Sequence, residues 1–85
     1  MATKLNFKKD GSRWVCELNP TVPFSVQVRM AEKKDFTVYA FIGGMEPVSL
    51  ASTNIYDNLI FQVDVPEGVT VRMVAHSEVL DAMMV

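Results

Sequence analysis

The stretch LNFKKDGSRWVC, residues 5–16, decides the fold class, because two alternating segments flank an Asp10-Gly11 pair. Apolar and polar residues alternate on both sides of that pair, which is the period-2 pattern of half-buried β-strands. Asp-Gly favours a two-residue type I′ turn, since glycine accepts the positive φ angle that this turn requires. The sequence therefore predicts a β-hairpin with Asp10 and Gly11 at its tip.

This turn also sets a cross-strand register. The predicted pairs are Lys9 with Ser12, Phe7 with Trp14, Leu5 with Cys16, and Lys4 with Glu17. One face of the hairpin is then apolar and the other is charged, whereas a slip of one residue would set Trp14 opposite a lysine. We therefore expect Trp14 and Cys16 to face the core.

A second hairpin is predicted at Pro66-Glu67-Gly68, where proline presets φ and glycine takes the left-handed position of a three-residue loop. The strands on either side alternate in the same way. The register pairs Val65 with Val69, Val63 with Val71, Phe61 with Met73, and Leu59 with Ala75.

The middle of the chain predicts strands at 24–30 and 36–42, joined by the polar loop 31–35. Pairing Met30 with Phe36 leaves Tyr39 and Phe41 on the face opposite the core. The expected core stripe consists of Phe24, Val26, Val28 and Met30.

Gly43-Gly44 predicts a tight return into a strand at 45–51, with Val48 opposite Tyr39. Pro47 cannot donate to a ladder, which indicates an edge strand or a bulge. The segment 78–85 fits either a last strand or a short helix capped by Ser77. Six to seven strands in 85 residues predict a single all-β domain spanning 1–85. We expect a small antiparallel β-sandwich, immunoglobulin-like or jelly-roll.

Composition limits the possible functions. The chain is 49% apolar and 21% charged, which is at the apolar end of ordinary usage and suggests that another chain covers some of its surface. Residues 1–42 carry seven Lys/Arg and four Asp/Glu, net +3, whereas residues 43–85 carry one Arg and six acids, net −5. Strands from the two halves usually interleave in a sheet, so we expect much of this dipole to cancel.

The residues that could carry catalysis or bind a metal are few. Cys16 and His76 are the only cysteine and histidine, which rules out a disulfide or a Cys/His metal site within one chain. We interpret Cys16 as an apolar filler, His76 as a rim residue near Asn58, and Asn54, Asp57 and Asn58 as turn residues. No enzyme activity, metal or cofactor is predicted.

The placement of charges and the lengths of the apolar runs argue against nucleic acid and membranes as partners. Lys4, Lys8, Lys9 and Arg13 fall on the face opposite Phe7 and Trp14 in the predicted register, and the net charge is −2. The longest apolar run, residues 38–42, is too short to cross a bilayer, and no signal peptide follows Met1. The expected location is intracellular by default, or a virion.

An apolar patch and an apolar tail are the features that indicate binding. The chain is therefore predicted to be a structural or interaction module that docks on itself or on a larger assembly, most concretely a virus (phage) capsid decoration protein. Alternatives are a small carbohydrate- or peptide-binding sandwich and a single-stranded nucleic-acid-binding barrel. The candidate interface residues are Tyr39, Phe41, Val48, Leu80, Met83, Met84 and Val85.

Overall fold

Two antiparallel β-sheets packed face to face form the molecule. The computed structural model describes residues 2–20, 23–53 and 57–85, and over these residues it contains nine strands and no helix. The strands are β1 (Thr3–Lys4), β2 (Lys8–Asp10), β3 (Arg13–Leu18), β4 (Phe24–Met30), β5 (Phe36–Phe41), β6 (Val48–Thr53), β7 (Asn58–Val63), β8 (Thr70–Ala75) and β9 (Val79–Met84).

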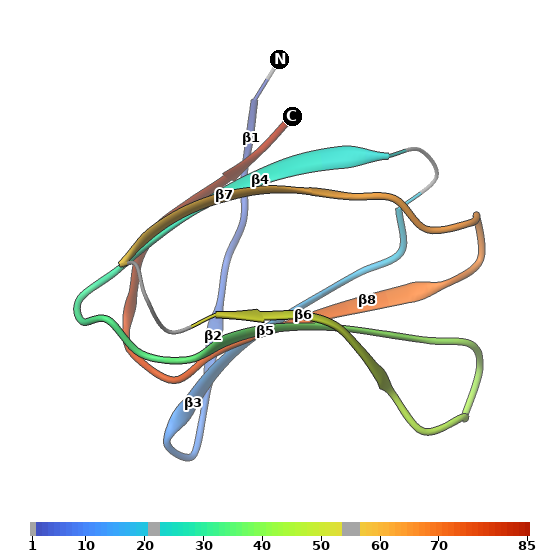
Figure 1. The fold of residues 1–85 in the computed structure, drawn as a ribbon, viewed down its shortest axis with the longest axis horizontal. Coiled ribbons are helices and arrows are strands. Elements are labelled where there is room, and N and C mark those ends of the chain that lie inside the picture. Colours follow the sequence, from blue (N-terminus) through green and yellow to red (C-terminus); the bar gives the residue numbers. More distant parts are fainter. Residues whose placement is uncertain (1, 21–22, 54–56) are drawn as a thin grey trace.

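One sheet has the strand order β1-β9-β4-β7, and the other has the order β2-β3-β8-β5-β6. Figure 1 shows the two layers, with β4 and β7 in the upper one and β5, β6 and β8 in the lower one. The predicted all-β sandwich is confirmed. There are more strands than expected because the N-terminal segment splits between the sheets and because residues 79–84 form a strand rather than a helix.

The first hairpin is confirmed between β2 and β3, but its predicted tip is wrong. Asp10 pairs with Arg13, which leaves Gly11 and Ser12 in the turn. Gly11 has a φ of 65° and Ser12 has no positive φ, as expected for a type II′ turn with glycine at its first central position. Lys9 therefore pairs with Trp14. This two-residue shift leaves Trp14 and Cys16 facing the core, as predicted.

The predicted pair of Leu5 with Cys16 is wrong because the chain leaves one sheet for the other between β1 and β2. The predicted pair of Phe7 with Trp14 is wrong because Trp14 pairs with Lys9. Residues 3 and 4 pair with β9, and the Leu5 amide donates to the Ala82 carbonyl at 2.8 Å. Leu5 is buried. Figure 1 shows this segment descending from the upper layer to the lower one.

Two other predicted pairings are wrong for a common reason. β4 pairs with β7 and β9, while β5 pairs with β6 and β8, so the loop 31–35 connects the two sheets. In the same way, β7 and β8 lie in different sheets, although Gly68 has the expected positive φ of 93°. Alternation identifies the side chains that face the core, but strands that face each other across the core alternate in the same way as strands paired within a sheet.

The β5–β6 hairpin is confirmed, and β6 is an edge strand, as Pro47 indicated. Val48 pairs with Ala40 rather than with Tyr39, and a bulge at Leu50 shifts the register further between Val38 and Tyr39. The core contains the predicted stripe of β4 together with Cys16. Its buried members are Leu5, Cys16, Phe24, Val26, Val28, Met30, Phe36, Val38, Leu59, Val63, Val71, Met73, Ala75 and Ala82.

Candidate interaction surface

The seven residues predicted to form an interface do not lie on one surface. Tyr39 and Phe41 alternate with the core residues of β5 and so lie on the outer face of the five-stranded sheet. Val48 shares the inner face with its partner Ala40, at the edge of the same sheet. The remaining four belong to the other sheet or follow it: Leu80, Met83, Met84 and Val85.

The C-terminal residues divide further. Met84 pairs with the buried Val26 and is partly buried against the core, so only part of its side chain is exposed to a partner. Met83 pairs with Gln27 on the outer face of the four-stranded sheet, beside a shallow polar depression of about 140 Å³. Val85 has an exposed side chain, but its amide and carbonyl both bond to the backbone of Ser25. The chain itself therefore holds the tail in place.

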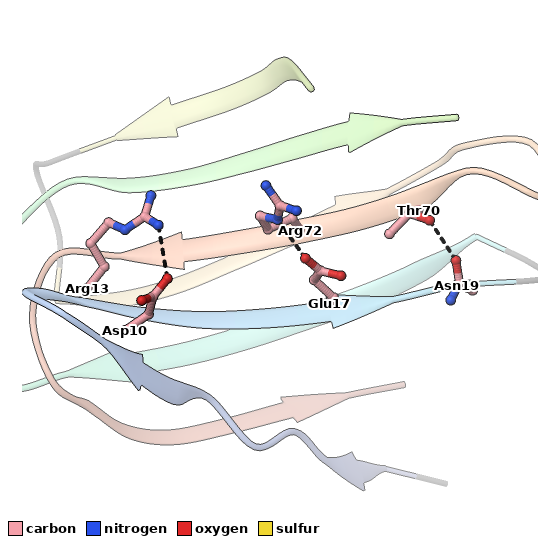
Figure 2. Close-up of polar contacts among 6 residues, drawn as sticks. All are labelled: Asp10, Arg13, Glu17, Asn19, Thr70 and Arg72. Atoms are coloured by element: carbon pink, nitrogen blue, oxygen red, sulfur yellow. Dashed lines mark hydrogen bonds and ion pairs between the residues drawn. The ribbon is translucent and has the colours of Figure 1, made fainter. Parts of the chain in front are cut away.

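The chain's own residues partly cover the aromatic patch of β5. Tyr39 pairs with Arg72 of β8, and the Arg72 guanidinium lies 4.9 Å from the centre of the Phe41 ring. Arg72 Nε also donates to Glu17 Oε1 at 2.7 Å, as Figure 2 shows. Tyr39 and Phe41 are half-buried as a result, so this patch is a weaker candidate than the sequence suggested.

Figure 2 shows two more polar contacts along β3. Arg13 donates to Asp10 at 3.2 Å across the first hairpin, and the Thr70 hydroxyl donates to Asn19 at 2.8 Å. Together with the Glu17 ion pair, they tie β3 to both of its neighbours. The charged side chains of Asp10, Arg13, Glu17 and Arg72 are thus paired with one another within the chain.

The lateral sides of the sandwich differ in how well their edges are protected. On one side the edge strands β1 and β2 have only two and three residues, and they carry Lys4, Lys8, Lys9 and Asp10. On the other side β6 and β7 have six residues each and no charged residue. Short strands and lysines are two of the features with which natural sheets prevent unwanted pairing. The β6 and β7 edges lack both.

Exposed apolar side chains gather on this unprotected side, which we call the β6 side. Its members come from β6, from the turn before it and from β7. They are Ile42, Met45, Val48, Leu50 and Ile60, five of the seven large apolar residues that are exposed in the described part of the chain. Only Val48 was among the candidates predicted from the sequence.

Three hollows accompany these side chains. At the end of the sandwich, an open groove of about 300 Å³ is lined by Ile42, Met45 and Val48 together with Val65, and Glu46 is its one charged lining residue. Two further hollows of about 320 and 230 Å³ lie between β6 and β7, and Val38, Ala51 and Phe61 line both. The β6 side therefore offers both apolar side chains and recesses that could accept a partner's side chains.

The missed residues left weak signals in the sequence. Ile60 falls between the inward residues Leu59 and Phe61, so the alternation alone placed it outward. Leu50 could not be assigned a face because the bulge interrupts the alternation. Ile42 and Met45 are at the ends of the strands predicted at 36–42 and 45–51, but β5 ends at Phe41 and β6 begins at Val48, so both lie in the β5–β6 turn.

Of the reactive groups, Cys16 lies in the core as predicted, whereas Asn58 begins strand β7 rather than lying in a turn. Cys16 is buried, and burial followed by the neighbouring Glu17 carboxylate raises the pKa of its thiol. His76 is exposed, and its amide donates to the Asp35 carbonyl at 3.0 Å. Asn58 accepts a bond from Gln27, while Asn54 lies outside the described residues.

The first hairpin departs from prediction in one respect that concerns binding. Lys9 does not lie on the face opposite Trp14, as predicted, but beside it, with its Nζ 5.6 Å from the centre of the half-buried Trp14 ring.

Among the described residues, no group of three or more His, Cys, Asp or Glu side chains is arranged to hold a metal. Within those residues there is also no helix of the length and hydrophobicity needed to span a membrane.

Comparison of the chain with protein-family models, with curated proteins and with solved structures gives no match.

Proposed function

We propose that this chain is a non-enzymatic interaction module that docks on a copy of itself or on a larger assembly through the β6 side. The observation that carries the proposal is the gathering of Ile42, Met45, Val48, Leu50 and Ile60 beside an uncharged edge and an apolar groove. Exposed apolar clusters of this kind are typical of binding surfaces on small soluble proteins. The most concrete instance is a virus capsid decoration protein, a role that the small size and apolar composition support.

The test compares two exposed apolar residues. Met45 is 72% exposed and lines the groove, whereas Val85 is 69% exposed and lies outside it. We expect the wild-type chain either to exceed its monomer mass of 9.5 kDa in light scattering or to co-sediment with a particle from its native source. Met45→Glu should weaken that association at least tenfold, about 1.4 kcal/mol, and Val85→Glu should leave it unchanged.

Two results would contradict the proposal. One is a wild-type chain that stays monomeric at every concentration and sediments with no particle. The other is an association that Val85→Glu abolishes and Met45→Glu does not, since binding would then use the C-terminal residues.

A further inference from the structure

The outer edge of β6 is the longest unprotected hydrogen-bonding edge of the five-stranded sheet. β6 pairs with β5 along one side, and no described strand pairs with its other side. Its sequence, VSLAST, contains neither charge nor proline. We propose that the partner at the β6 side is a second copy of this chain, joined by antiparallel pairing of the two β6 strands across a two-fold axis. This inference rests on the proposed function and names its partner.

Self-pairing suits β6 because the strand carries no charged residue. A two-fold axis sets a strand opposite itself, so a charge near its centre would lie close to its own copy, which is unfavourable. β6 has no such charge. The alternative, in which β6 pairs head-to-tail with β2 of another copy, offers only three residues and would place Lys8 and Lys9 on an uncharged strand. Such a contact also need not close into a defined oligomer.

The register of the pair follows from overlap. Only one antiparallel register uses all six residues, and it sets Val48 opposite Thr53, Ser49 opposite Ser52 and Leu50 opposite Ala51. This register also matches the faces of the two strands. Ser49 and Ser52 pair with Tyr39 and Thr37, which both lie on the outer face. A shift of one residue would set Ser49 opposite the inner-face residue Ala51.

The dimer would join two five-stranded sheets into one continuous sheet. In the full-overlap register, the axis passes between Leu50 and Ala51. The two half-exposed Leu50 side chains are thereby brought close together. Removing these two side chains from water would add hydrophobic stabilisation to that of the new backbone hydrogen bonds.

Cysteine cross-linking tests the register directly. Directly opposed residues of antiparallel strands have Cα atoms about 4.5–5.5 Å apart, within disulfide range. Residue 49 of one copy lies opposite residue 52 of the other, so two residues 49 are offset by three positions, about 10 Å. A mixture of Ser49→Cys and Ser52→Cys chains should therefore form an oxidised dimer, while either variant alone should not. Wild-type chains, whose Cys16 is buried, serve as the blank.

A charge substitution with a matched control tests the contact itself. Leu50 and Leu80 are 50% and 49% exposed, and both are extra residues at bulges. We expect Leu50→Lys to raise the dimer dissociation constant at least about tenfold in sedimentation velocity and Leu80→Lys to leave it unchanged. Both variants should retain the β-sheet circular dichroism spectrum.

The outcomes separate this inference from the proposed function. A wild-type dimer without cross-linking in the mixed sample, or one that Leu50→Lys does not weaken, would overturn β6 pairing while leaving docking through the apolar groove of the β6 side, which Met45→Glu tests. A monomer that co-sediments with a larger particle would also overturn it while supporting the proposed function. A monomer without any such association would overturn both.

Discussion

At the scale of single residues, Cys16 links the core to the pH dependence of stability. Burial is the main cause of its raised thiol pKa, and Glu17 adds to it. Well below the ordinary value of 9.0, the folded and unfolded thiols are both protonated. Above that pH the unfolded chain loses a proton that the folded chain still holds, so this thiol lowers the free energy of unfolding as pH rises.

We therefore expect the stability advantage of the wild type over Cys16→Ala to shrink as pH is raised from 8 to about 10. Urea denaturation of both proteins at each pH measures the difference, and titration of lysines and tyrosines cancels between them. A difference that stays constant over this range would show that the thiol is not shielded from solvent.

At the scale of elements, the first hairpin shows why turn chemistry determines register. The Asp-Gly pair pointed correctly to a tight turn, but glycine favours the first central position of a type II′ turn as well as the second of type I′. The structure adopts the first arrangement, with Asp10 within β2 and bonded to Arg13. The two turns differ by a two-residue shift that leaves the faces unchanged, so alternation could not distinguish them.

Gly11→Ala should destabilise the protein by about 1–2 kcal/mol, because alanine is strained at a φ of 65°. Open space surrounds the position where a Cβ would lie, so strain rather than a clash is the cause. Ser12→Ala, in the same turn, should change stability by less than about 0.5 kcal/mol. Thermal unfolding of the two variants checks this. Equal losses would mean that turn conformation does not limit the hairpin.

The elements also show how far the sequence could predict the candidate site. Strand positions and inward faces followed from alternation. In β4, for example, the four predicted core residues Phe24, Val26, Val28 and Met30 are all buried. Partners could not be predicted where successive strands change sheets, as β7 and β8 do. The candidate surface was mostly missed because it depends on which strands lie at edges, a property of the assembled sheets rather than of any strand. Pro47 was the one local sign of such an edge.

At the scale of the whole molecule, the interleaving of the two halves of the chain determines the charge distribution. In the order β1-β9-β4-β7, strands from the first and second halves of the chain alternate. This is the interleaving expected to cancel much of the charge difference between the two halves. A lateral difference persists, because Lys4, Lys8 and Lys9 lie along the β1 and β2 edges, while the β6 and β7 edges are uncharged. This difference separates the side protected from pairing from the side available for it.

The same interleaving predicts that the two sheets unfold together. Val28 of the four-stranded sheet is fully buried in a core to which both sheets contribute, and Trp14 of the five-stranded sheet packs against that core. Val28→Ala should cost about 2 kcal/mol, or roughly 10 °C in melting temperature. Because the core is shared, Trp14 fluorescence and far-ultraviolet circular dichroism should report the same shift. If the unfolding midpoint of the variant stays at the wild-type value by fluorescence but falls by circular dichroism, the two sheets unfold independently.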